Sequence, residues 1–386
     1  MEVNRGGFFT RFNDRVIILS AVLCAFLPSI LSFVAEAALV TSLIINSRTR
    51  KMIFSCKLCY WLLPIALTSI IPPIFYGNYV GIVAGAGLVL LLIFSIYLKK
   101  AITSQIFEEG IKFASLASVI VTFVAIAERI AYAVWPALSM NKDLRCSGVF
   151  FNPNLFGTAV VFVILAALYK IMSGQGNRRV YTAVIIFNLI SMALCGSLLG
   201  MAELVCGVFF LLLFNKRWKF VAVFVGAGLL LMAAIAAYPK LLPRILEASE
   251  SFNLRYRVWQ LAVILFKQTP LFGRGILTYM MESPKYVGAE LGFNVWVTTC
   301  AHSILLDGLL CLGIVGTVFL SGFLIHYYVP IVKNAVKRIN RPICALGLAM
   351  TMGVIFHGIF DETIAWPQLT ILFFFILSGA FLSKKE

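Results

Sequence analysis

The stretch from Arg255 to Gly316 decides how this chain is organised. It begins with Arg-Tyr-Arg-Val-Trp (255–259), continues with Thr-Pro-Leu-Phe-Gly-Arg-Gly (269–275), and ends with Ala-His-Ser-Ile-Leu-Leu-Asp-Gly-Leu-Leu-Cys-Leu-Gly-Ile-Val-Gly (301–316). Cations, aromatic residues and a lone histidine gather here, in a chain that is otherwise nearly all apolar. The stretch therefore marks the one long segment expected outside a lipid bilayer, followed by the return of the chain into it.

The composition sets the class of the protein. Hydrophobic residues make up 61% of the chain, charged residues only 12%, and the mean hydropathy is +0.97, values far outside the range of soluble domains. We therefore expect an all-α polytopic membrane protein. Its first apolar run, 16–27, follows three arginines and continues without a small-residue cleavage site, so we interpret it as a retained anchor.

The number of spans follows from the length of the apolar runs. At about 20 residues per span, the chain divides into about twelve membrane helices that form a single integral membrane domain, 1–386. A long outer loop, 239–302, separates the ninth helix from the tenth, and a loop of such length inside a compact protein is usually functional. The predicted spans are 15–28, 29–46, 57–76, 78–98, 112–136, 153–172, 180–196, 199–214, 218–238, 303–329, 342–361 and 364–383.

The orientation follows from the basic residues. Most of the 32 lysines and arginines lie in those alternate loops that place both termini in the cytoplasm. The net charge of +16 then has a membrane explanation, the anionic lipid of the inner face, and nucleic acid is not an expected partner. The loop 239–302 would lie at the outer face.

Within that loop, apolar residues recur at helical spacing and predict an amphipathic helix at the outer membrane interface; they are Leu254, Val258, Leu261 and Leu265. Arg255 and Trp259 are four residues apart and share a face of this helix. The pair is suited to gripping a phosphate while the indole packs at headgroup level. An ordinary interfacial anchor with snorkelling arginines is the alternative.

His302 opens the next membrane helix. A histidine at the membrane boundary can act as a base, donate to an oxyanion or simply cap the helix. The topology brings other polar groups to the same outer level, and ionisable groups at membrane depth are functional candidates because they are costly to bury. These groups are Arg145, Asn152-Pro153-Asn154, Gly196-Ser197, and His357 with Asp361 four residues later.

No metal site or cofactor is expected. Cys56 and Cys59 have zinc-ligand spacing, but no second pair or nearby histidine completes the set. Cys146 and Cys300 both fall on the outer side, where a disulfide between them is possible. The chain has no GxxxxGK or GxGxxG loop, so an ATP-driven mechanism is not indicated.

Taken in order, these motifs resemble the O-antigen ligase and polymerase family over about residues 145–370. The resemblance implies a metal-independent, inverting glycosyltransferase of the bacterial cytoplasmic membrane, without a cofactor. Its donor would be a glycan on undecaprenyl pyrophosphate at the outer leaflet, and its acceptor another glycan, lipid A core or a protein. The motifs are Arg145-x-x-Gly148, Asn152-Pro153-Asn154, Arg255-x-x-x-Trp259, Pro270-Leu-Phe-Gly-Arg-Gly275, His302-Ser303, Gly313-x-x-Gly316 and His357-x-x-x-Asp361.

The resemblance also implies roles for individual residues. Arg255 would bind the pyrophosphate, because an arginine fork holds phosphate oxygens and keeps its charge, with Arg257 or Arg274 as a second ligand. His302 would be the base for the acceptor hydroxyl, or else would hydrogen-bond the pyrophosphate. The remaining substrate-binding candidates are Arg145, Asn154, Trp259, His357 and Asp361.

One position departs from the family pattern. Members commonly carry an arginine after the Ser or Thr of the turn at 195–198, and here that position is Leu198. Either another cation, such as Arg129 or Arg145, replaces it, or the lipid pyrophosphate is held differently, or activity is reduced.

Rival interpretations come from other functional classes. Twelve helices with scattered charges also suit a secondary transporter or a lipid-linked glycan flippase, although the two halves show no evident symmetry and the polar groups gather at one face. A non-catalytic scaffold is a third reading. Within the enzyme reading, a ligase and a polymerase share these motifs.

Overall fold

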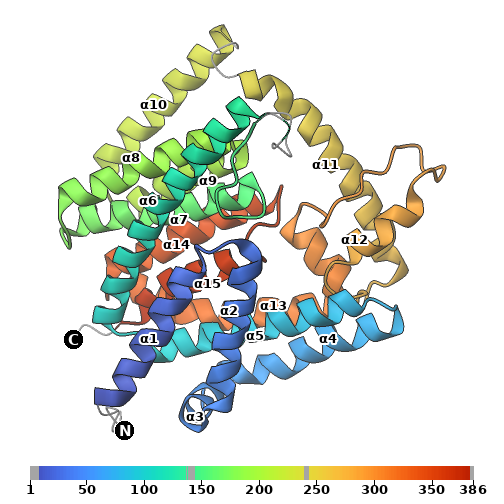
Figure 1. Cartoon of the computed structure of the whole chain (residues 1–386), viewed down its shortest axis with the longest axis horizontal. Coiled ribbons are helices and arrows are strands. Elements are labelled where there is room, and N and C mark those ends of the chain that lie inside the picture. The colour runs from blue at the N-terminus through green and yellow to red at the C-terminus, as the bar shows by residue number, and fades with distance from the viewer. Residues whose placement is uncertain (1–7, 136, 138–143, 239–242, 383–386) are drawn as a thin grey trace.

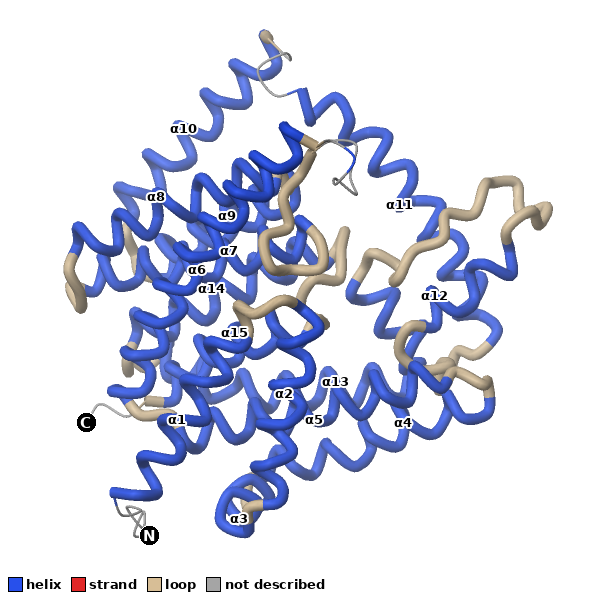
Figure 2. The backbone as a smooth tube through the Cα atoms, in the orientation of Figure 1, coloured by secondary structure: helices blue, strands red, loops and turns tan. Residues whose placement is uncertain are grey.

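The computed structural model describes residues 8–135, 137, 144–238 and 243–382, and over these residues every regular element is a helix. The all-α prediction is confirmed (Figures 1 and 2). The elements are α1 (Phe8–Cys24), α2 (Ser29–Ile45), α3 (Ser47–Phe54), η1 (Lys57–Trp61), α4 (Leu62–Phe75), α5 (Tyr79–Ala101), α6 (Ser104–Val134), α7 (Pro153–Ser173), α8 (Arg178–Cys195), α9 (Leu198–Phe214), α10 (Trp218–Ala237), α11 (Pro243–Gln268), α12 (Thr278–Glu282), η4 (Ser283–Tyr286), α13 (Ile304–Val336), α14 (Arg341–Gly358), α15 (Pro367–Ser378) and η5 (Gly379–Phe381).

Eight of the described helices are long and apolar enough to cross a membrane. They are η1 with α4, α5, α6, α7, α8, α10, α13 and α14. The bent pair of α2 and α3, with an angle of 87° between them, would make a ninth, whereas α9 and α15 are shorter apolar helices. A multi-pass membrane protein is therefore confirmed, and the count of twelve spans stays a prediction.

Local sequence explains where two key helices begin. The Asn152 side chain accepts hydrogen bonds from the backbone N–H groups of Asn154 (2.9 Å) and Leu155 (3.0 Å), and Pro153 occupies the first helical position, so α7 has both favoured signals of a helix start. Gly196 ends α8 in the left-handed conformation. Ser197 then caps α9 by accepting from Gly200 N at 3.1 Å. The Gly-Ser turn therefore splits the long apolar run as predicted.

Segments predicted to be cytoplasmic meet one another in the structure. Arg341 donates from Nη2 to the carbonyl of Phe214 at 2.6 Å, and Asn334 donates to the carbonyl of Ala380 at 3.2 Å. Near the start of the chain, Arg48 pairs with Asp14 at 3.1 Å. These contacts link the α9–α10 connection to the α13–α14 connection, and α13 to η5, as expected of loops at one end of a bundle. Which end faces the cytoplasm stays a prediction.

The helix α13 is broken at Gly313, which has φ 65° and ψ −175°. The segment Thr269–Gly275, which we call the docking loop, supplies the backbone partners lost at the break. Ile314 N donates to Pro270 O (2.8 Å), Val315 N to Leu271 O (3.0 Å), and Gly275 N to Cys311 O (2.9 Å). Non-helical backbone at membrane depth requires such partners. The predicted continuous span 303–329 is therefore corrected to two helical halves that meet at Gly313, with the docking loop hydrogen-bonded to both.

The helix α11 confirms the predicted amphipathic pattern but not its predicted location. Val258, Leu261 and Leu265 are fully buried, in a small core that is separate from the main one. The other buried members of this core are Ala262, Tyr279, Ala301 and Leu310. The apolar face is therefore covered by protein, namely α12, the segment 286–301 and the start of α13. This face is therefore turned away from lipid, and the location of α11 at the outer membrane interface stays a prediction.

Candidate functional site

The candidate site lies where four segments far apart in the sequence meet. They are the start of α7, the Cys195–Ser197 turn, the loop that leads into α13, and the 359–366 loop after α14, with α11 alongside. In Figures 1 and 2 the loops around residues 150, 300 and 360 converge between the bundle and α11. The site therefore depends on tertiary packing and not on any one element.

His302 and Asp361 form the centre of the site. His302 Nδ1 lies 2.9 Å from Asp361 Oδ1, which also accepts from the backbone N–H of Glu362 at 2.9 Å. Asp361 Oδ2 accepts from Asn154 Nδ2 at 2.6 Å. With the proton of the neutral ring placed on Nδ1, toward the carboxylate, Nε2 is the ring atom left to accept a proton.

The carboxyl of Asp361 is ionised despite its burial. Burial alone would raise its pKa, but the hydrogen bond and charge of His302, together with the charges of His357 and Arg255, hold the pKa of Asp361 below its usual range. A carboxylate paired with an imidazole favours the imidazolium form. The pair can therefore stabilise a proton arriving on His302.

The His302 ring is held from several sides. Its backbone has φ +50°, a left-handed conformation that costs a non-glycine residue about 1–2 kcal/mol and that is often found at functional sites. The ring stacks on Trp296, with centroids 5.5 Å apart, and Trp259 Nε1 donates to the His302 carbonyl at 3.3 Å. Because α13 begins at Ile304 with Ser303 in the N-cap position, His302 is not the helix cap, and that alternative is wrong.

Arg255 and Trp259 share a face of α11, as predicted, and this face is turned to the 359–366 loop. Arg255 Nε donates to the carbonyl of Phe360 at 2.8 Å, and Nη1 donates to the Ser251 hydroxyl and carbonyl. The Trp259 and Phe360 rings are 6.2 Å apart. Within the described residues, no hydrogen bond is recorded for Arg255 Nη2. The guanidinium thus lies beside the His302–Asp361 pair with donor capacity left.

Arg145 lies at the turn where the family pattern has its arginine. Its Nε donates to the carbonyl of Cys195 at 2.8 Å, and its Nη2 donates to Asn154 Oδ1 at 2.8 Å. Ser197 Oγ donates to the same Asn154 oxygen at 3.0 Å. Arg129 contacts the residue before Arg145, because its Nη1 donates to the carbonyl of Leu144 at 2.7 Å. Asn154 therefore links the Arg145 guanidinium to Asp361.

His357 does not contact Asp361 through its side chain. Its Nδ1 lies 2.6 Å from Glu203 Oε2, and both side chains are fully buried. Thr158 donates to the same Glu203 oxygen at 2.9 Å. The His357 carbonyl accepts from Asp361 N at 3.0 Å, so His357 fixes the start of the turn that carries Asp361 and lies beneath the site.

Arg274 and Arg257 are not brought into the His302–Asp361 network. Arg274 pairs with Glu282 (3.0 Å), donates to Gln268 Oε1 (2.7 Å) and lies 5.0 Å from the centre of the Tyr76 ring. Arg257 is half-buried, and the structure records no partner for it in the part of the chain described. Arg274 thus has its own internal partners, whereas Arg257 is available.

Sequence reasoning missed three residues behind the His302–Asp361 pair. The Asp307 Oδ1 atom accepts from the backbone N–H of Ala301 at 2.8 Å, and the Asp307 carboxyl lies within 4.8 Å of Glu362 and of the Cys300 thiol. The adjacent acids Asp361-Glu362 at a helix end were the available signal. Cys300, His302 and Asp361 also lie within 4.8 Å of one another and are the type of donors that a zinc ion accepts. Cys300 and Cys146 are both free thiols, so the possible disulfide between them is not formed.

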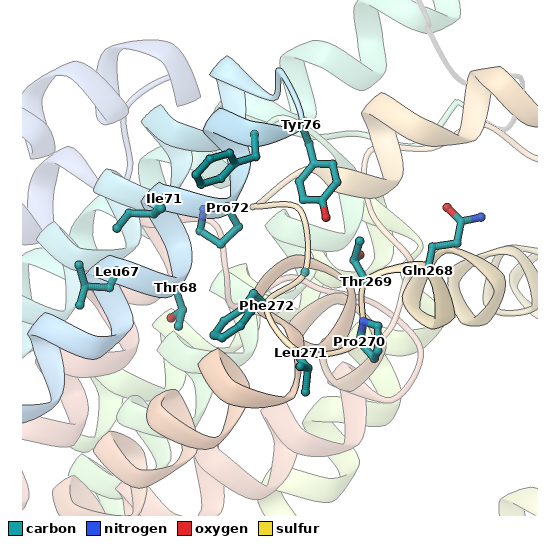
Figure 3. Close-up of a pocket in the computed structure, with 12 residues that line it drawn as sticks. Leu67, Thr68, Ile71, Pro72, Tyr76, Gln268, Thr269, Pro270, Leu271 and Phe272 are labelled. Atoms are coloured by element: carbon teal, nitrogen blue, oxygen red, sulfur yellow. The ribbon is translucent and has the colours of Figure 1, made fainter.

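A separate apolar cavity of about 590 Å³ lies between α4 and the docking loop. Figure 3 shows side chains of α4 on one side and those of 268–273 on the other. The lining suits a hydrocarbon chain and not a charged group. It is lined by Leu67, Thr68, Ile71, Pro72, Phe75, Tyr76, Gln268, Thr269, Pro270, Leu271, Phe272 and Gly273.

The fold and site define a multi-pass helical membrane protein with a histidine–carboxylate pair and an arginine at the meeting point of its loops. Residues 182–321 match the family model of the O-antigen ligase. This range includes Arg255, Trp259 and His302, and the match supports the family that the order of the motifs indicated. Asp361 and Arg145 lie outside the matched range and complete the site from its flanks. No curated protein matches the chain.

Proposed function

We propose that the protein is a membrane glycosyltransferase that moves a glycan from undecaprenyl pyrophosphate to an acceptor at the outer face of the bacterial cytoplasmic membrane. The observation that carries this proposal is the His302–Asp361 pair, 2.9 Å apart, with Arg255 beside it in an O-antigen ligase domain. A base and a fixed cation are the two groups that transfer from a pyrophosphate requires.

The reaction needs one proton transfer and one displacement. His302 Nε2 takes the proton of the acceptor hydroxyl while its oxygen attacks the anomeric carbon, and Asp361 stabilises the imidazolium that forms. The bond between that carbon and the pyrophosphate oxygen breaks, and the electron pair leaves with the lipid pyrophosphate. Attack opposite the leaving group inverts the anomeric centre.

The developing charge on the pyrophosphate is neutralised by arginines. Arg255 is the first ligand, because its guanidinium lies beside the pair with Nη2 still able to donate. Arg257 ranks before Arg274 as a second ligand, because Arg274 is occupied by Glu282. We further propose that Arg145 replaces the family arginine missing at Leu198, since its guanidinium binds the carbonyl of Cys195 in the same turn. Fixed guanidinium charges would make a metal ion unnecessary.

The remaining candidates position these groups. Asn154 orients Asp361 through its 2.6 Å hydrogen bond, and Trp259 packs where sugar or headgroup would lie. His357 holds the turn before Asp361. This proposal keeps the predicted twelve spans, with both termini in the cytoplasm.

The test is an assay of the purified protein in lipid nanodiscs with an undecaprenyl-pyrophosphate glycan and candidate acceptors. We expect release of undecaprenyl pyrophosphate. A longer lipid-linked glycan as product would identify a polymerase, whereas transfer to lipid A core or a protein would identify a ligase. Movement of the intact donor across the bilayer without release would show a flippase instead, and no turnover or movement would favour a scaffold.

A further inference from the structure

The three residues behind the His302–Asp361 pair form a partly buried acidic cluster that the proposed reaction does not use. The cluster is Cys300, Asp307 and Glu362, with one ligand atom of each within 4.8 Å of the others. Asp307 comes from the first turn of α13, and Glu362 from the loop after α14. The cluster thus joins the two segments that carry His302 and Asp361.

Asp307 shapes the turn that carries His302. Its Oδ1 accepts from Ala301 N at 2.8 Å, and its backbone N–H donates to the Ser303 carbonyl at 2.8 Å. Those two bonds close the segment 301–303 around the left-handed His302. Asp307 Oδ2 is buried, and no N–H or hydroxyl of the described residues donates to it.

Glu362 supplies the missing donor. Its carboxyl and that of Asp307 lie within 4.8 Å of each other, and two carboxyl groups this close are stabilised when one of them carries a proton that both share. Asp307 is the acceptor, since it already accepts from Ala301. Glu362 also donates its backbone N–H to Asp361, so a proton on its carboxyl fixes Asp361 relative to the His302 turn.

The surrounding charges agree with this assignment. Burial, followed by the charge and hydrogen bond of Asp307 and then the charge of Asp361, raises the pKa of Glu362 well above its ordinary value. The other titratable groups that face these two carboxyls are the thiols of Cys300 and Cys311, the phenol of Tyr279, and His302. Arg255 and His357 act on Asp361.

From this geometry we propose that Glu362 is a positioning residue that works in its protonated form, donating to Asp307 and thereby clamping the Asp361 loop onto the His302 turn. The inference rests on the proposed transferase function and deepens it. Loss of the Glu362 proton would place two negative charges side by side in the cluster and loosen the His302–Asp361 contact. Since the folded-state pKa is raised, the clamp is intact below that pKa and is lost as the pH rises through it.

The test compares Glu362→Gln with Glu362→Ala in the full-length protein. The glutamine is nearly isosteric, cannot ionise and still donates to Asp307, so we expect near-wild-type turnover at neutral pH and activity that persists to higher pH than in the wild type. The alanine leaves Asp307 Oδ2 without a donor, which should lower turnover by about tenfold or more. Glu290→Gln, at an exposed glutamate, is the matched control.

A second measurement needs no catalysis. The infrared carbonyl band of a protonated carboxyl should be present in the wild type at neutral pH and reduced in Glu362→Gln, but unchanged in Glu290→Gln. Equal bands in the wild type and Glu362→Gln would overturn the proposal, as would equally inactive or equally active Gln and Ala variants. If the wild type releases no undecaprenyl pyrophosphate, the transferase proposal fails, and the infrared band still decides whether Glu362 holds a proton.

Discussion

His302 is useful to the proposed reaction because of its neighbours. Asp361 fixes one ring nitrogen, Trp296 fixes the ring plane, and Trp259 holds the backbone. A histidine so constrained presents its second nitrogen without a search among rotamers, and such positioning contributes substantially to catalysis. The proposed role of His302 therefore depends on these three neighbours as much as on the histidine itself.

The first prediction concerns His302. Replacement by alanine should lower turnover by roughly two to four orders of magnitude if it is the general base, with binding of the lipid-linked donor largely retained. Turnover and donor affinity are measured separately, by single-turnover release and by equilibrium binding. If donor binding weakens together with the rate, His302 is a phosphate ligand instead, and near-wild-type transfer would withdraw the catalytic assignment.

Arg255 gives the second prediction. Arg255→Ala should abolish transfer without loss of expression, and Arg255→Lys should rescue it poorly, because an ammonium cannot reproduce the guanidinium fork. Lys267→Ala is the control, as an exposed cation on the same helix. Full activity of the lysine variant would reduce Arg255 to a merely electrostatic role or an anchor.

Asp361 gives a prediction that depends on pH. Its pKa is lowered in the folded protein, so its contribution to stability is present above the pKa of an unfolded aspartate and is lost as the pH falls through the folded value. Asp361→Asn should therefore unfold at a lower temperature than the wild type at neutral pH. Thermal unfolding at decreasing pH should show the gap in unfolding temperature narrowing, and a gap that widens in acid would contradict the assignment of Asp361 as an ionised hydrogen-bond acceptor.

Removal of metal ions checks the charge-neutralisation argument. Because arginines are proposed to stabilise the leaving pyrophosphate, prolonged treatment with a chelator should leave turnover unchanged. Cys300, His302 and Asp361 could together accept a cation, so the same preparation should be analysed for bound zinc. A chelator-sensitive rate restored by zinc would replace the arginine-only mechanism.

At the scale of elements, the docking loop and α13 form one unit. The motif Pro270-Leu-Phe-Gly-Arg-Gly275 was predicted to carry a phosphate ligand, but most of its length supplies backbone partners to the break at Gly313. Its Arg274 is held by Glu282 and Gln268. The motif therefore has a structural role, because its backbone stabilises the broken part of α13.

This unit gives a prediction with a built-in control. Gly313→Ala should strongly destabilise the protein, since φ at Gly313 is +65° and a Cβ there would overlap the carbonyl of Leu271. Gly308→Ala, in the same helix, has its nearest neighbour at 3.6 Å and should be tolerated. Size-exclusion profiles and thermal unfolding in detergent compare the two; a stable Gly313→Ala variant would contradict the broken helix.

The sequence predicted these elements unequally, for physical reasons. Hydrophobic run lengths located the helices closely, since burial in lipid requires continuous apolar stretches. Periodicity gave the apolar face of α11, but it cannot say whether lipid or protein covers that face. The break at Gly313 depends on backbone partners in the segment 270–275, and no local sequence pattern contains that relation. The His302–Asp361 contact could be suspected only from the shared outer level, whereas the Asp307–Glu362 contact had no separate signal.

At the scale of the whole molecule, two sets of polar contacts stand out among the described residues. One set lies near the start of the chain, where Arg48 pairs with Asp14, and among the connections 214–218 and 334–341 and the segment after α15. The other surrounds His302 and Asp361. A bundle with distinct ends is what a one-sided enzyme needs, because its donor and acceptor must meet outside the hydrocarbon region while the helices anchor it.

Sidedness is the prediction at this scale. Ala289→Cys, in the loop 280–290, should react with a membrane-impermeant thiol reagent in intact cells or spheroplasts, whereas Gln175→Cys, in a loop predicted to be cytoplasmic, should react only after permeabilisation. Both positions are exposed, and the wild type, whose cysteines are at least partly buried, serves as the blank. The reverse labelling pattern would overturn the topology.

The break in α13 also affects how the protein is made. All the backbone groups that complete the break, from Pro270 to Gly275, leave the ribosome before α13 does, as do the α4 residues packed beside Gly316. The histidine side of the site can therefore assemble as soon as α13 is synthesised. Asp361 and Glu362 are synthesised only after α14. A nascent chain that stops before them would thus possess the arginine and the histidine without their carboxylate partners, and the proposed transfer would have to wait for the segment after α14.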